Sequence, residues 1–99
     1  MRKQIKLIQQ RPNTSINFFN AADEFKQLKQ TYVTAGKLDD LGFEMSNNNL
    51  TKTWTLVFTT DEDYLNFKSD GHQHTYWNNL LSHNTSNSIS YSLEETNIE

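Results

Sequence analysis

Three histidines are the side chains in this 99-residue sequence that most readily suggest chemistry. His72 and His74 stand two residues apart, and histidine is a common metal ligand, but Asp70 is the only carboxylate beside them. Two histidines with one weak third partner are poor support for a metal site. We therefore predict no bound metal and no cofactor.

His74 has two interpretations that the sequence leaves open. Helical spacing places it on an apolar stripe that we expect on one helix: Tyr64, Phe67, Gly71, His74, Trp77 and Leu81. On that stripe it is either a core histidine with satisfied hydrogen bonds or a proton-transfer residue in a pocket. His83 lies near the end of the same helix, where its ring can bond free carbonyl groups.

The aromatic residues suggest a second kind of chemistry, the binding of an aromatic molecule. Trp54, His74, Trp77 and Tyr91 form the candidate pocket, with Tyr76 beside them, and the alternative is that these aromatic side chains are plain core. The carboxylates at 39–40 fit a solvated loop, and those at 61–63 fit the first turn of a helix. The sequence contains no glycine-rich phosphate loop, Ser-His-Asp pattern or nucleophile elbow, so catalytic residues stay unknown.

The strand expected at 50–58 is the element on which these residues depend. Trp54, Leu56 and Phe58 alternate with polar and β-branched residues, which predicts a strand with one buried face. The same alternation predicts strands at 3–10, with Ile5 and Leu7 inward, at 40–46, and at 88–94. An inward set is expected from all four strands: Ile5, Leu7, Phe43, Met45, Trp54, Leu56, Phe58, Ile89, Tyr91 and Leu93.

Two helical stretches separate these strands. The first has Asn20 as its N-cap and an apolar face of Ala21, Phe25, Leu28, Tyr32 and Ala35, and it ends at Gly36. The second begins after Thr60, and we expect a break or kink at 70–71 because glycine weakens a helix by about 1 kcal/mol. Asn47, Asn48 and Asn49 form the turn between the second and third strands.

Composition narrows the class of protein. The chain has no cysteine, no apolar run of membrane-spanning length and no signal-peptide pattern, so we expect a cytoplasmic protein without a membrane partner. Its net charge is −3, and the predicted outer sheet face offers Thr, Ser and Gln rather than aromatic residues. These features argue against a nucleic-acid partner.

The order of elements predicts an α+β fold. A β-α-β-β-α-β sequence is that of the ferredoxin-like fold, a four-stranded antiparallel sheet with two helices on one face. Ninety-nine residues make one domain, 1–99, with the first and third strands central. The outer face is polar apart from Ile8 and Val57, whose apolar spot a partner sheet could cover.

Several segments carry a resemblance to a known superfamily. They are the Arg-Pro…Phe-Phe stretch before the first helix, the Leu-Thr-Lys-Thr-Trp strand and the Glu-Asp-Tyr…Phe helix. With the element order, they resemble the dimeric α/β-barrel superfamily, which includes the antibiotic-biosynthesis-monooxygenase-like domains. More narrowly, the chain is similar to small proteins of unassigned role from marine phage and environmental sequence. The resemblance implies a homodimer joined through the polar sheet faces.

Two functions follow as hypotheses. The first is a small homodimeric binding or accessory protein of phage origin. The alternative is a cofactor-free monooxygenase-like or small-ligand-binding enzyme with a pocket between sheet and helices. They differ in one observable: the pocket needs a cavity of roughly 300 Å³ or more, whereas the accessory protein fills the same space with side chains.

Overall fold

The computed structural model describes residues 2–19 and 22–98. Strands and helices follow one another along the chain as β1 (Arg2–Gln10), α1 (Ala22–Thr34), β2 (Leu38–Met45), β3 (Thr51–Phe58), α2 (Asp61–His72), α3 (Thr75–Ser86) and β4 (Ser90–Ile98). The four strands form one sheet in the order β2-β3-β1-β4, and every pair of neighbours is antiparallel. The predicted α+β class, the four-stranded antiparallel sheet and the central position of the first and third strands are confirmed.

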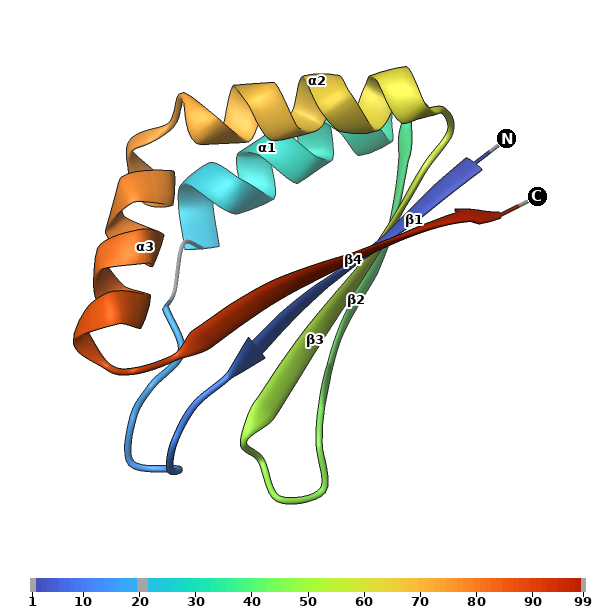
Figure 1. The fold of residues 1–99 in the computed structure, drawn as a ribbon. Coiled ribbons are helices and arrows are strands. Elements are labelled where there is room, and N and C mark those ends of the chain that lie inside the picture. Colours follow the sequence, from blue (N-terminus) through green and yellow to red (C-terminus); the bar gives the residue numbers. More distant parts are fainter. Residues whose placement is uncertain (1, 20–21, 99) are drawn as a thin grey trace.

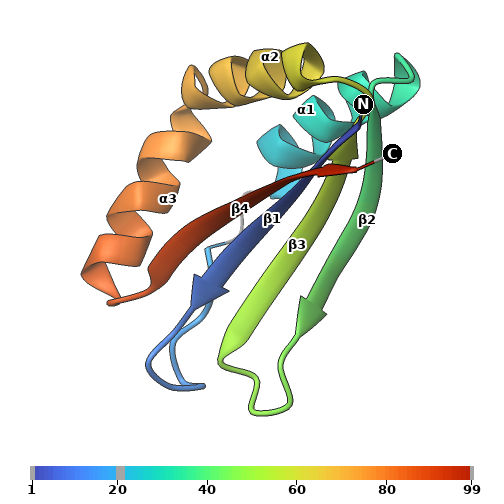
Figure 2. The ribbon, with the colours of Figure 1, turned by 45° about the vertical axis from the view of Figure 1, so that its right-hand side comes forward.

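The helices lie on one side of the sheet, as Figures 1 and 2 show. Helices α1 and α2 cover one end of the strands, and α3 turns down beside β4. The opposite end, where β2 and β3 are joined by their hairpin, extends beyond the helices. Arg2 of β1 pairs with Ile98 of β4, so the first and last strands have neighbouring ends under the covered part of the sheet.

The second helical stretch is two helices, where the sequence predicted one with a break or kink at 70–71. Helix α2 continues through Gly71, and the break falls at Gln73 and His74. A Cβ atom at Gly71 would lie 2.9 Å from the hydroxyl oxygen of Tyr76, so glycine permits a close approach between the two helices. The backbone N–H of Tyr76 donates to Glu24 Oε2 over 3.1 Å, which caps the start of α3 from α1. This long-range contact helps place the helix boundary after position 71.

The residues predicted to mark helix ends are confirmed at Thr60 and Gly36. Thr60 caps α2 by accepting a hydrogen bond from the Asp63 backbone N–H at 3.1 Å. Gly36 follows α1 with a φ of +75°, and the N–H of Lys37 reaches back to the carbonyl of Tyr32. The predicted positions Asn20 and Ala21 lie outside the described residues. Ala35 is exposed beyond the end of α1, so its placement on the buried helical face is wrong.

The core sits at the covered end of the sheet. Its most buried side chains, Ile5, Leu56 and Phe58, are at most 1% exposed and come from the two central strands. Around them pack Leu28, Tyr32, Leu38, Tyr64, Phe67 and Tyr76. The alternation that predicted β3 therefore holds, with Trp54, Leu56 and Phe58 turned toward the helices.

Strand β2 departs from its predicted pattern. Leu41, Phe43 and Met45 are 64%, 49% and 37% exposed, so the prediction that they form a buried face is wrong. A register shift between Asp40 and Phe43 marks a bulge, and Gly42 adopts a φ of +78° within it. The bulge leaves Leu41 in solvent and returns Phe43 to the same side as its partner Trp54, at the end that the helices do not cover.

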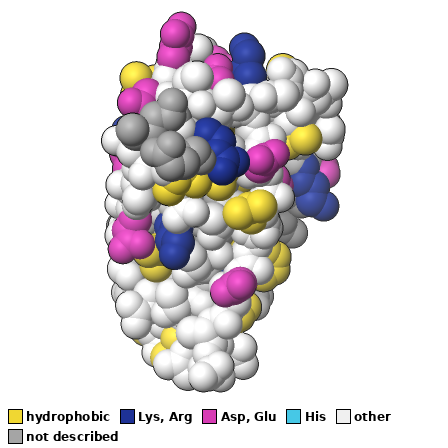
Figure 3. Space-filling view, turned by 90° about the vertical axis from the view of Figure 1, so that its right-hand side faces the viewer, with side chains coloured by type: hydrophobic (Ala, Val, Ile, Leu, Met, Phe, Trp, Pro, Cys, Tyr) yellow, Lys and Arg dark blue, Asp and Glu magenta, His cyan; other side chains and the backbone are white. Residues whose placement is uncertain are grey.

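The outer face of the sheet is polar and carries both signs of charge. Figure 3 shows this side, where basic and acidic side chains are interspersed and the apolar ones are scattered. Lys6 of β1 stands here in register with Thr55 of β3 and Glu94 of β4. Val57 is buried on this face, so little of the predicted apolar spot remains open. Within residues 2–19 and 22–98, no helix has the length and apolar character that crossing a bilayer requires.

Candidate functional site

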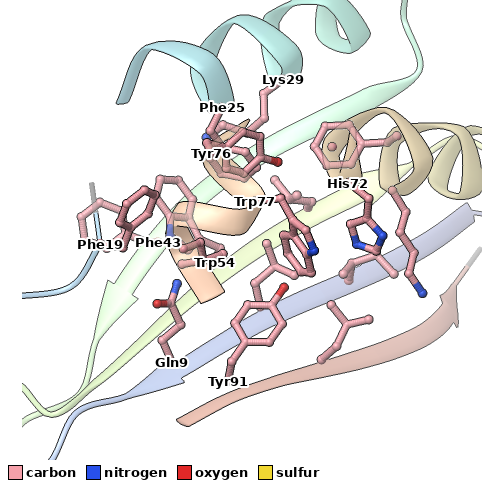
Figure 4. A pocket seen from close by; sticks show the side chains of 18 of the residues that line it. Gln9, Phe19, Phe25, Lys29, Phe43, Trp54, His72, Tyr76, Trp77 and Tyr91 are labelled. Atoms are coloured by element: carbon pink, nitrogen blue, oxygen red, sulfur yellow. The ribbon is translucent and has the colours of Figure 1, made fainter. Parts of the chain in front are cut away.

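A cavity of about 540 Å³ lies between the inner face of the sheet and the helices. Side chains from all four strands, all three helices and the loop before α1 line it, and most of them are apolar or aromatic. Figure 4 shows the aromatic rings converging on this space from both sides. The inward side chains beyond the core therefore surround a hollow. The alternative expectation was that side chains would fill this space.

Beyond Phe58, which lines the inner end of the cavity, strand register arranges the sheet side in three rows. The innermost row contains Leu56 and Ile5 and belongs to the buried core. The middle row contains Trp54, Leu7 and Leu93. The outermost row, which we call the polar row, contains Lys52, Gln9 and Tyr91 on β3, β1 and β4. The floor of the cavity thus changes from apolar to hydrogen-bonding toward the open end of the sheet.

Trp54 is the centre of one aromatic wall. Its ring lies 4.9 Å from that of Phe43 and meets that of Phe25 edge-on at 5.9 Å, measured between centroids. Lys29 places its ammonium 4.1 Å from the centroid of the indole, and Lys52 does so at 5.2 Å. Both lysine ammonium groups therefore make cation–π contacts with the same indole.

Trp77 and Tyr91 form the opposite wall together with a histidine. His72 stacks on Trp77 with centroids 4.2 Å apart and an interplanar angle of 27°. Tyr91 meets Trp77 edge-on at 6.0 Å, with its hydroxyl directed toward the indole (Figure 4). Burial raises the pKa of Tyr91 to about 12, so its hydroxyl is a hydrogen-bond donor at neutral pH.

The loop before α1 closes one side and is held at two points. Arg11 donates to the carbonyl oxygens of Ile16 and Asn49, at 2.8 Å from Nη1 and 2.6 Å from Nη2. His83 Nε2 lies 2.7 Å from the carbonyl oxygen of Asn17, an acceptor, so this ring nitrogen carries the proton. These bonds fix the loop whose Phe19 lines the cavity.

The charged residues around the cavity are all basic. Four lysines line it, and no aspartate or glutamate within residues 2–19 and 22–98 does: Lys26, Lys29, Lys52 and Lys68. Lys29 is neutralised, because its Nζ lies 2.9 Å from Asp40 Oδ2 while its side chain is 8% exposed. Lys52 has no carboxylate within ion-pair distance among the described residues, and its ammonium lies 4.4 Å from the Phe43 ring centroid. Burial lowers the pKa of Lys52, and the nearby charge of Lys29 lowers it further.

Gln9 is the unusual polar side chain of the site. It is 7% exposed, and its Oε1 has no hydrogen-bond partner among the described residues. A buried carbonyl oxygen without a partner costs about 1–3 kcal/mol. In Figure 4 the amide nitrogen of Gln9 points up into the cavity between Trp54 and Tyr91. An amide held here at such a cost is a candidate for ligand recognition.

Three of the four predicted pocket residues, Trp54, Trp77 and Tyr91, line this one cavity. His74 does not: it is the exposed N-cap of α3, with Nδ1 3.9 Å from Glu24 Oε2. Its predicted place on the apolar stripe is wrong, because the helix break at 73–74 resets the helical phase. The sequence suggested His72 only as a metal ligand, and it did not single out Lys52 and Gln9. Lys52 and Gln9 could have been predicted to face inward, because each lies two residues from an inward residue of its own strand, Trp54 and Leu7.

Metal ligands do not gather in the described part of the chain, where no three His, Asp or Glu side chains are placed to hold an ion. The chain matches no family model, no curated protein and no solved structure.

Proposed function

We propose that this protein binds a small, largely apolar and aromatic molecule in the cavity between its sheet and helices. The observation that supports this is the cavity itself, whose volume of about 540 Å³ falls in the roughly 300–1,000 Å³ range of small-molecule sites. Aromatic walls and a few convergent polar groups are the usual composition of such sites. An accessory protein without a ligand would have no need of this hollow.

Binding is better supported than the alternative of a cofactor-free, monooxygenase-like enzyme. That alternative relied on His74 as a proton-transfer residue, and His74 lies outside the cavity lining. The rings that do line it, Trp54, Trp77 and Tyr91, supply stacking surface and one phenol donor. These groups recognise a molecule without needing to transform it.

Titration with naphthamide, an uncharged aromatic probe, tests the proposal. Trp54 and Trp77 are the two tryptophans of the chain and both line the cavity, so their indole N–H signals in a proton–nitrogen NMR spectrum report binding. We expect both signals to shift to a saturating end point at one equivalent. No saturable shift at millimolar probe would overturn the proposal.

Leu7→Phe is the matched variant for this titration. Leu7 lies in the middle row of the cavity floor, packed against the edge of the core, where a larger ring would take up ligand space. We expect a native circular dichroism spectrum with naphthamide binding about tenfold weaker, which corresponds to a loss of about 1.4 kcal/mol. Unchanged affinity would place the probe elsewhere on the protein.

We also propose, independently of the cavity, a ferredoxin-like fold and a homodimer of the barrel type. One face of the sheet is free of helices, and it carries Lys6 together with Glu44 and Glu94. In a dimer formed through this face, the lysine of one copy could pair with a glutamate of the other. Light scattering should give twice the chain mass of 11.6 kDa. A monomeric mass would remove the dimer and leave the cavity proposal standing.

A further inference from the structure

We propose that the cavity selects an organic acid, an aromatic or other apolar body with one carboxylate that is held at the polar row by Lys52 and Gln9. This inference rests on the proposed binding function and specifies the chemical class of the ligand. The apolar body would lie over the middle row, Trp54, Leu7 and Leu93. The acid group would lie toward the open end of the sheet.

Strand register brings the two recognition groups together. Lys52 and Gln9 are direct partners across the antiparallel pair β3–β1, so their side chains leave the same face of the sheet. Directly opposite residues have Cβ atoms about 4.5–5.5 Å apart. An ammonium and an amide at that spacing can both donate to one carboxylate.

The surroundings of Lys52 lack a negative charge that an acid would supply. Its ammonium faces the rings of Phe18, Phe43 and Trp54, and Lys29 stands on the same indole. Lys29 has Asp40 as its counter-ion, and Lys52 has none among the described residues. Burial lowers the pKa of Lys52, and repulsion by Lys29 lowers it further. A bound carboxylate would pair with Lys52 and offset that repulsion.

The amide of Gln9 supports the same ligand independently of charge. It is a buried polar side chain whose nitrogen is directed into the cavity and whose oxygen has no partner in the described structure. Leucine or methionine would fill this position without the cost of the unpartnered oxygen. Retention of an N–H donor here is explained when the ligand presents an acceptor.

The test compares naphthoate with naphthamide, which have the same ring system and differ in charge. Wild-type protein is expected to bind naphthoate at least about tenfold more tightly than naphthamide, the effect of one charge-assisted hydrogen bond. Lys52→Met, which keeps the aliphatic stem, should abolish this preference, so that the ratio of the naphthoate affinity to the naphthamide affinity falls to about one. Lys68→Met removes another lining lysine, from α2, and should keep the preference.

The possible outcomes separate this inference from the function on which it rests. Failure of both probes to bind removes the binding function itself. Equal affinity of wild type for the two probes leaves the binding function standing and overturns the acid. Equal losses in Lys52→Met and Lys68→Met would show diffuse attraction by the lysines and overturn the assignment to the polar row.

Gln9→Met should change stability and naphthoate affinity in opposite directions, which substitution of a purely structural residue would not do. The variant removes an unsatisfied buried carbonyl, so its melting temperature should rise, while naphthoate affinity falls about fivefold or more. A fall in both stability and affinity would indicate that Gln9 supports the fold, and would remove it from the recognition site.

Discussion

A chain carrying Leu56→Asp is expected to be unfolded under conditions in which the wild type folds. Leu56 is 1% exposed at the centre of the core, between Ile5 on β1 and the bulged strand β2. The substitution loses about 1.5–3 kcal/mol of apolar burial and places a carboxylate where its desolvation costs several kcal/mol more. That sum is comparable to the whole stability of a small domain, about 5–15 kcal/mol.

Leu41→Asp is the matched control, because it makes the same replacement on an exposed leucine of a strand in the same sheet. Surface changes of this kind stay within about 0.5 kcal/mol. Far-UV circular dichroism and thermal melting of the two variants should therefore separate them completely. A cooperatively melting Leu56→Asp protein would show that the core is not where the sheet register places it.

The tyrosines of this protein are expected to resist ionisation as the pH rises through 10. Burial is the first cause for all four, and it raises the pKa of Tyr76 and of Tyr91 to about 12. The pKa values of Tyr32 and Tyr64 are also raised, with further contributions from Asp70, which accepts the Tyr32 hydroxyl at 2.6 Å, and from Glu95 beside Tyr64. A free tyrosine titrates near 10.

The raised tyrosine pKa values make the folded state less stable at high pH, because the unfolded chain loses its phenol protons at a lower pH than the folded chain does. Below pH 10 both folded and unfolded chains keep their phenols protonated, and the contribution to stability is fully present. Between about 10 and 12 the unfolded chain releases these protons first, so the free energy of unfolding falls as pH rises. Alkali should thus produce tyrosinate absorbance and loss of circular dichroism in one cooperative step.

Tyr91→Phe provides the control for the titration. With three tyrosines left of four, the amplitude of the absorbance step should fall by about one quarter while remaining coupled to unfolding. A tyrosinate signal near pH 10 in a chain with native circular dichroism would contradict the burial of at least one ring.

The parts of the fold that depend on local chemistry were predictable from sequence. The alternation around Leu56 identified the central strand, because β3 pairs with β1 without a bulge and so keeps the two-residue period of its side chains. Gly36 and Thr60 marked helix ends, because a positive φ and a hydroxyl acceptor are needed there whatever packs outside. Strand order followed from the right-handed crossover rule.

The sequence-based predictions failed where a contact from a distant part of the chain, or a bulge in a strand, changed the periodicity of the side chains. The break before Thr75 accompanies a cap supplied by Glu24 from another helix, which no local spacing reveals, and it carried His74 out of the site. The bulge at Gly42 shifted the phase of β2, although a glycine inside a strand was a usable signal. Residue types alone could not show whether inward aromatic side chains fill the interior or surround a space.

The pairing of Arg2 with Ile98 has a practical consequence for experiments on the cavity. Arg2 and Ile98 lie at the covered end of the sheet, while Lys52 and Gln9 pair near the other end of β3 and β1. An affinity tag, a fluorescent fusion or a linkage to a sensor chip attached beyond Arg2 or Ile98 would therefore start at the end of the sheet away from Lys52 and Gln9. Immobilised protein should accordingly give the same affinities as protein free in solution.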